Sequence, residues 1–135
     1  MRGILADINA GKHVKAIISV WTSDAWREIW NHLGLTVSSF PAQGLSYNAS
    51  DVAIWRTCQR EGLVLITGNR NDDGPDSLES VVRDENLPES LPIVTISDPD
   101  RLLRDRLYTE KVAERLLEYL FAIDDVRAAG RLFVP

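Results

Sequence analysis

Cysteine, histidine and methionine are scarce in this chain of 135 residues. A single cysteine, Cys58, excludes an intrachain disulfide framework and a zinc cluster built on cysteines. The two histidines, His13 and His32, are too few and too badly placed for a zinc site. We therefore interpret Cys58 as a small apolar residue on a helix, and His32, near Gly34, as a residue at a helix end.

Long apolar runs and glycine-rich loops are also missing. No apolar stretch approaches the length of about 20 residues that a membrane helix requires, and the N-terminal stretch lacks the apolar core of a signal peptide. We therefore expect a cytoplasmic protein with no membrane association. Neither of the familiar glycine-rich phosphate loops is present, so nucleotide binding has little support.

Charge and size indicate one acidic globular domain. The net charge of −5 argues against a broad basic surface for nucleic acid, although a local basic patch is compatible with it. Hydrophobic residues make up 44% and charged residues 26% of the chain, which is ordinary for a globular protein. Because the chain shows no repeat, low-complexity tract or linker, we expect a single domain over residues 1–135.

Short apolar runs separated by turn residues predict buried strands that alternate with helices. The four expected strands are Gly3–Ile8, Leu35–Phe40, Leu63–Ile66 and Ile93–Ile96. The segment RLFVP after Gly130 is predicted to be a further strand at an edge. This alternation favours the α/β class, with a mostly parallel sheet, right-handed crossovers and helices on both faces.

Helical periodicity is clearest in two segments, Val14–Leu33 and Thr109–Asp125. The first forms either one helix or two, with Thr22 or Ser23 as the cap of the second. Its three tryptophans fit one buried face, and a stacking platform for bases is the alternative. Shorter helices are expected from a cap at Asn48 or Ser50 to Gly62 and over Leu78–Asn86 after a cap at Ser77, and Ser97–Asp100 are expected to begin a further turn and helix.

The stretch LVLITGNRNDD, Leu63–Asp73, changes abruptly from apolar to polar. Its apolar part is typical of a central strand covered on both faces. In open α/β sheets, ligands lie beyond the carboxyl ends of the strands, where these polar residues would stand. The alternative is a solvated turn, which asparagine, aspartate and glycine form readily.

Two further acids map to the same edge of the predicted sheet. Asp7 lies near the end of the first strand, and a carboxylate buried there would need a partner or an ion. The alternative is that the strand ends at Ala6 and Asp7 caps the segment after it. Asp51 lies in the first turn of a helix, where the helix dipole alone would explain it. Because Mg²⁺ prefers oxygen ligands, the combined positions predict a site for metal-assisted phosphodiester hydrolysis.

Four motifs carry a resemblance to a known family. They are ILADIN at residues 4–9, DVAIWRTCQREG at 51–62, LVLITGNRND at 63–72 and PIVTIS at 92–97. In order and spacing they resemble the PIN-like family, in particular its short, stand-alone bacterial branch of toxin-like proteins, from Ile4 to about Leu120. The resemblance implies a three-layer α/β/α fold, an acidic pocket that holds Mg²⁺ or Mn²⁺, endoribonuclease activity and an antitoxin partner.

The resemblance also assigns residues. Asp7 and Asp51 match two of the family's acids, whereas Asn69 stands where the family usually has a third aspartate, after the strand-ending Thr67. Asn71 stands where a further acid is common. An amide keeps an oxygen ligand but loses the charge, which should weaken cation binding unless Asp72 or Asp73 compensates. The expected metal set is therefore Asp7, Asp51, Asn69 and Asp72, and the first three are the expected catalytic residues.

These residues support three hypotheses. In the first, the protein is a metal-dependent ribonuclease whose RNA contacts are Asn9, Lys12, Thr67, Arg70 and Asn71. For Lys12, Arg70 and Arg56, ordinary surface charge is the alternative. In the second, the two amides mark a binding module that has lost the metal site. A phospho-acceptor receiver domain is a distant third, because no aspartate ends the third strand. The apolar content of the tryptophan-bearing helices leaves room for a homodimer.

Overall fold

All five strands join one sheet in which every neighbouring pair is parallel. In the computed structural model, which describes residues 1–68 and 77–135, the strand order is β2-β1-β3-β4-β5. The strands are β1 (Gly3–Ala6), β2 (Thr36–Ser38), β3 (Leu63–Thr67), β4 (Ile93–Ile96) and β5 (Arg131–Val134). The predicted α/β class is confirmed, and so is the edge strand near the C-terminus, which pairs with β4.

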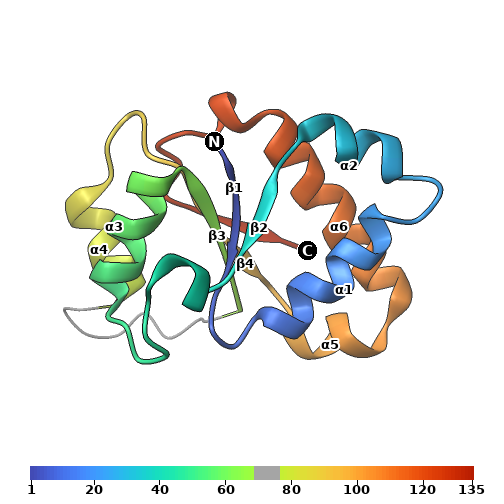
Figure 1. Ribbon diagram of the computed structural model, residues 1–135, viewed down its shortest axis with the longest axis horizontal. Helices are drawn as coiled ribbons and strands as arrows, with labels where there is room; N and C mark the ends of the chain where they lie inside the picture. Colours follow the sequence, from blue (N-terminus) through green and yellow to red (C-terminus); the bar gives the residue numbers. More distant parts are fainter. Residues whose placement is uncertain (69–76) are drawn as a thin grey trace.

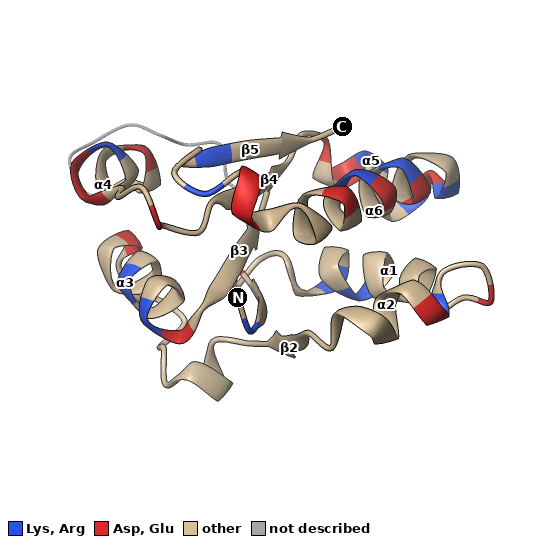
Figure 2. Cartoon of the chain, turned by 90° about the horizontal axis from the view of Figure 1, so that it is seen from above, with Lys and Arg blue, Asp and Glu red and all other residues tan. Residues whose placement is uncertain are grey.

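Helices cover both faces of this sheet and give three layers (Figures 1 and 2). One face is covered by α3 (Asp51–Glu61) and α4 (Leu78–Glu85). The helices on the other face are α1 (Gly11–Trp21), α2 (Arg27–Leu33), α5 (Pro99–Arg104) and α6 (Arg106–Phe121). Two short 3₁₀ helices, η1 (Pro41–Gln43) and η2 (Ile123–Asp125), follow β2 and α6. Among the described residues, none of these helices has the length and apolar character needed to cross a membrane.

Several predicted boundaries were wrong. Strand β1 ends at Ala6 rather than Ile8, and Ile8 is 45% exposed. Strand β2 is only three residues long, because the chain leaves the sheet and buries Phe40 against the layer of α3 before Pro41 begins η1. Helix α6 begins at Arg106 instead of Thr109, because the Asp105 side chain accepts a hydrogen bond from the Tyr108 N–H and caps it there.

The segment between β1 and β2 forms two helices instead of one. Neither Thr22 nor Ser23 caps the second helix. Their hydroxyls instead donate back to the carbonyl oxygens of Ile18 and Val20, one turn earlier in α1. The predicted caps at Ser50 and Ser77 are confirmed, since each side chain accepts a hydrogen bond from a backbone N–H three residues later.

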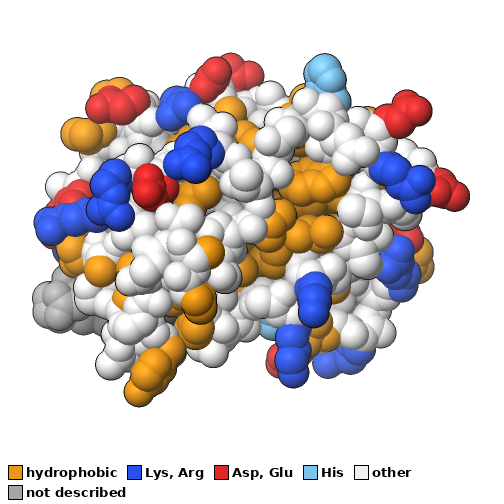
Figure 3. Space-filling model, viewed as in Figure 1, with side chains coloured by type: hydrophobic (Ala, Val, Ile, Leu, Met, Phe, Trp, Pro, Cys, Tyr) orange, Lys and Arg blue, Asp and Glu red, His pale blue; other side chains and the backbone are white. Residues whose placement is uncertain are grey.

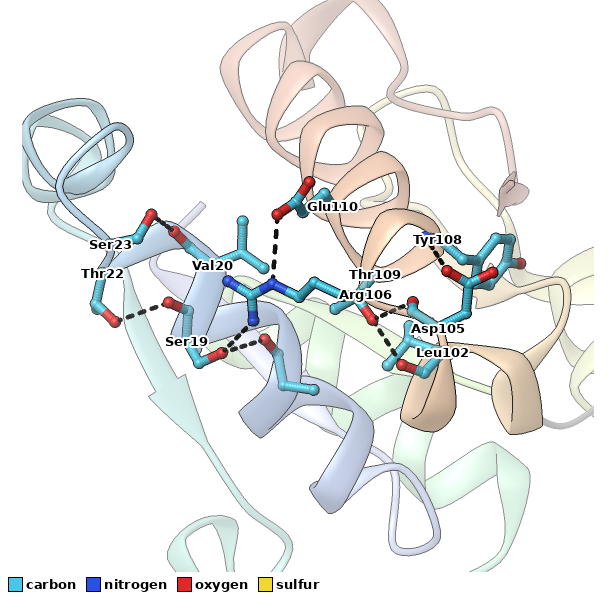
Figure 4. Close-up of polar contacts among 11 residues, drawn as sticks. Ser19, Val20, Thr22, Ser23, Leu102, Asp105, Arg106, Tyr108, Thr109 and Glu110 are labelled. Carbon is cyan, nitrogen blue, oxygen red and sulfur yellow. Dashed lines mark hydrogen bonds and ion pairs between the residues drawn. The ribbon is translucent and has the colours of Figure 1, made fainter.

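The tryptophans of this segment pack in or against the core, as predicted, with Trp26 and Trp30 partly buried. Trp21 is fully buried, stacks on Trp30 with ring centroids 4.6 Å apart, and donates from its indole N–H to the Ala113 carbonyl at 3.0 Å. Arg106 adds a polar link between the same helices, because it reaches Glu110 on α6 and the Ser19 hydroxyl on α1 (Figure 4). These contacts hold α1 against α6 and fix where the first turn of α1 lies relative to the sheet.

Candidate functional site

A pocket of about 430 Å³ lies at the carboxyl edge of the sheet. In Figure 1, β1 and β3 run downward from the side of the molecule where the N-terminus lies, and α1 and α3 both begin at this lower edge. Strand β2 lies on one side of β1 and β3 on the other, so the direction of the connections reverses between β1 and β3. Ligands of open α/β sheets bind at such a point, and the residues that follow both strands, Asp7 and Gly68, line the pocket.

Asp7 is held in place by two hydrogen bonds to its carboxylate. The Thr67 hydroxyl, fully buried at the end of β3, donates to one oxygen at 2.7 Å, and the Ile8 N–H donates to the other at 2.8 Å. The Asp7 N–H also donates to the Ile66 carbonyl at 2.9 Å, which extends the ladder one residue beyond β1. The strand therefore ends at Ala6, but Asp7 does not cap α1, because the N-cap position of that helix is Ala10.

Asp51 reaches the same pocket from the other side of the sheet. Ser50 caps α3, since its hydroxyl accepts from the Ala53 N–H at 3.1 Å, and Asp51 follows in the first turn. Asp7 and Asp51 are both half-buried and both line the pocket, although 44 residues separate them in the chain. The structure thus brings together two acids that the sequence placed at one sheet edge.

The other predicted site residues fall in three places. Asn9 is exposed and lines the pocket, and Thr67 orients Asp7. Lys12 lines a neighbouring groove between α1 and β2. Arg56 lies away from both, in a two-pronged ion pair with Glu85 at 3.0 and 3.1 Å. The predicted residues Asn69, Arg70, Asn71, Asp72 and Asp73 lie outside the described residues.

Two chemically active side chains of the pocket were not predicted. Asp100, in the first turn of α5, lines it from the end of β4. The rule that selected Asp51 would have found Asp100 had it been applied to the next strand. His13 also lines the pocket, and both of its ring nitrogens are buried without a hydrogen-bond partner among the described residues. No sequence signal marks His13, because its surroundings are made by tertiary packing.

The donor set of the pocket suits a hard divalent cation. Mg²⁺ is commonly held by one or two carboxylates, with water and substrate phosphate oxygens completing its shell. Asp7 and Asp51 supply two carboxylates. Within residues 1–68 and 77–135, no three histidine, cysteine, aspartate or glutamate side chains lie together as a complete metal-ligand group. A cation held by these two carboxylates would take its remaining ligands from water or substrate oxygens.

The negative charge of this site affects the pKa of the Cys58 thiol. Burial on the inner side of α3, assisted by the negative charge of Asp7, raises the pKa of Cys58 to about 12. The thiol is therefore neutral over the physiological range and is not a nucleophile of the pocket. This agrees with its predicted part as a small apolar residue on a helix.

Comparison with known proteins found no family model, no curated protein and no solved structure that matches the chain. The resemblance to PIN-like proteins thus rests on the four motifs alone. The function has to be argued from the pocket and the residues that line it.

Proposed function

We propose that this protein is a metal-dependent endoribonuclease of the PIN-like type that uses Mg²⁺ or Mn²⁺. One observation carries the proposal: Asp7 and Asp51, from two distant elements, line one pocket at the point where the sheet topology reverses. The four motifs support the same conclusion, since they resemble that family in order and spacing.

The residues of the pocket have separable tasks in this proposal. Asp7 and Asp51 would hold the cation, and Thr67 would keep the Asp7 carboxylate oriented through its hydrogen bond at 2.7 Å. The positive end of α3 favours negative charge on Asp51 and on a phosphate bound beside it. A divalent cation bound there would activate the attacking water and neutralise charge that develops on the phosphate.

The experiment is cleavage of a mixed RNA pool by the purified protein with Mg²⁺, Mn²⁺ or EDTA. We expect metal-dependent cleavage that Asp7→Asn and Asp51→Asn each reduce by about 100-fold or more, because each removes one of two cation-holding charges. Asp84→Asn is the matched control. Asp84 is exposed on α4, so this substitution makes the same change of charge away from the pocket. Undiminished cleavage by Asp51→Asn would contradict the proposal.

A second candidate is a binding module that has kept the fold and lost the metal site. The amides at Asn69 and Asn71, where the family has acids, favour it. This candidate predicts that a folded protein cleaves no RNA and that Mg²⁺ and Mn²⁺ leave its melting temperature unchanged. A thermal shift with either ion that Asp51→Ala abolishes would count against it. A receiver domain remains disfavoured, because β3 ends with Thr67 where a phospho-acceptor aspartate would stand.

The biological role proposed with the nuclease is that of a toxin paired with an antitoxin protein. Its support is the resemblance to the toxin-like branch. Expression of the protein in a bacterial host should then arrest growth, and Asp51→Asn should relieve the arrest. Exposed apolar side chains on α2 and α6, including Ile29 and Phe121, leave room for a homodimer or for such a partner.

A further inference from the structure

A groove of about 390 Å³ runs between α1 and the edge strand β2. Lys12 and Lys15 line it from α1, Ser38 and Ser39 line it from the end of β2, and an apolar strip lies between them. Figure 3 shows hydrophobic side chains gathered between β2 and helices α1 and α2, with basic side chains below them over the beginning of α1. The groove therefore combines an apolar base with a positive rim, in a protein whose net charge is −5.

Folding alone does not account for the two lysines. They lie three positions apart on one face of α1, where like charges repel. Lys12 stands in the first turn of the helix, where the dipole disfavours a cation, and α1 carries no acid there. Among the described residues no carboxylate lies within ion-pair distance of either lysine, and Figure 2 shows α1 with basic residues and no acidic ones. An anionic ligand would resolve both unfavourable features.

The groove adjoins the carboxylate pocket across the first turn of α1. Lys12 and His13 are consecutive, so their side chains project about 100° apart around the helix. Lys12 lines the groove and His13 lines the pocket. Both ring nitrogens of His13 are buried without a hydrogen-bond partner among the described residues, which is rare in proteins.

We propose that the groove binds the phosphate backbone of single-stranded RNA on one side of the bond that is cleaved. Lys12 and Lys15 contact successive phosphates, and the apolar strip packs against ribose or base faces without reading their sequence. A groove of about 390 Å³ is within the size range of sites that hold a small ligand, which suits a nucleotide of a single strand. The inference rests on the proposed function, because it takes RNA as the molecule that occupies the carboxylate pocket.

An acidic polypeptide that pairs with the open edge of β2 is the competing occupant. This edge is poorly suited to it, because β2 has only three residues and offers few backbone groups to an added strand. Continuity with the carboxylate pocket also favours a polymer that carries a negative charge at every unit. The observations therefore favour nucleic acid, and the peptide is kept as an outcome of the test.

The test is binding of a short fluorescein-labelled oligouridylate in EDTA, which withholds the divalent cation that the proposed cleavage requires, measured by anisotropy over a range of salt concentrations. Each phosphate neutralised on a single strand contributes about −0.7 to the slope of log K against log salt. We expect Lys12→Ala and Lys15→Ala each to weaken binding and to reduce the slope by about 0.7. Lys111→Ala, at an exposed position of α6, is the matched control and should change neither quantity.

Three results would overturn the inference. They are an unchanged slope in both α1 variants, equal binding of a duplex of the same length, and tighter lysine-dependent binding of polyglutamate than of the oligonucleotide. Failure of the proposed function is distinguishable. Lysine-dependent binding without any RNA cleavage supports the groove and contradicts the nuclease, whereas cleavage with unchanged slopes supports the nuclease and contradicts the groove.

Discussion

Helices α1 and α3 both begin at the carboxylate pocket, but their first turns are built in opposite ways. Helix α3 has Ser50 as a side-chain cap and Asp51 in its first turn, which are the residues that stabilise a helix start. Helix α1 has Ala10 at its N-cap position without a side-chain hydrogen bond, and Lys12 in its first turn. The first turn of α3 therefore contains residues that stabilise a helix, whereas the first turn of α1 lacks a side-chain cap and carries a cation that the helix dipole disfavours.

Because of this difference, the residues in the first turn of α1 are stronger evidence for a ligand than those in the first turn of α3. Asp51 stabilises α3 whether or not it binds a metal, so its presence in the sequence is weak evidence for chemistry. Lys12 gains nothing for α1 from its position, so a ligand explains it better than the fold does. The comparison predicts that changes in α3 lower stability, whereas changes in the first turn of α1 raise stability and lower binding.

The largest expected effect concerns the buried face of α3. The unfolded thiol of Cys58 ionises above its ordinary pKa of 9.0, and the folded thiol only above about 12. The contribution of the buried, neutral thiol to stability is therefore fully present below the pKa of the unfolded thiol. It is lost as the pH rises from there through the pKa of the folded thiol. Near pH 11 the loss should reach about 3 kcal/mol.

The measurement is chemical unfolding between neutral pH and about pH 11. Cys58→Ala should lower stability at neutral pH by leaving a small void, but its stability should fall less steeply with pH than that of the natural protein. Because other groups also titrate in this range, the difference between the two slopes is the quantity to compare. Parallel slopes would show that the thiol is not buried in its neutral form.

The next largest effect concerns His13, in the first turn of α1. Its two ring nitrogens are buried without partners among the described residues, and each such atom costs about 1–3 kcal/mol. His13→Leu removes both, but it also loses the packing contacts of the ring, so the net rise in the free energy of unfolding should be about 1–2 kcal/mol. RNA cleavage should fall in the same variant. A loss of stability on this substitution would show that the ring makes favourable contacts that outweigh the missing hydrogen bonds.

Removal of the cap of α3 should have the opposite effect on stability. Ser50→Ala removes the hydrogen bond to the Ala53 N–H and should lower the free energy of unfolding by about 1 kcal/mol. Ser50→Thr keeps the bond and should retain most of the stability. Ser46→Ala is a control, because Ser46 is exposed and its hydroxyl donates to the nearby Asn48 side chain in the loop before α3. An equal loss in Ser46→Ala would assign the effect to the loop and not to the cap.

The fold was predictable where one local signal decided it. Runs such as Ile93–Ile96 are buried whatever lies beside them, so the strands and their parallel class were identified from the sequence. The boundaries depended on competition between neighbours: Ile8 is apolar yet exposed, and Asp105 caps α6 where periodicity indicated a later start. The strand order 2-1-3-4-5 was not predicted, because the side on which a crossover returns depends on the packing of whole layers.

Some residues of the candidate site were also predictable from the sequence, and others were not. Asp7 and Asp51 were identified because the carboxyl ends of parallel strands meet at one edge, and the structure places both in one pocket. The hydrogen bond from Thr67 to Asp7 joins β3 to the residue after β1, and residue spacing alone does not show it. His13 was passed over because a single histidine at a helix start has many ordinary explanations. Only the burial of its nitrogens distinguishes it.

The smallest expected effect is also the sharpest test of the comparison, because stability and binding should change in opposite directions. Lys12→Glu places an acid in the first turn of α1 and an opposite charge three residues before Lys15. Both changes favour the helix, and together they should raise the free energy of unfolding by about 0.5–1 kcal/mol. Oligonucleotide binding should weaken in the same variant, because a negative charge would now face the phosphates. Lys111→Glu makes the same change of charge in the middle of α6, beside Glu110, and should not stabilise the protein. If Lys12→Glu lowered stability, Lys12 would already have a favourable partner in the fold, and the contrast between the two helix starts would no longer indicate a ligand.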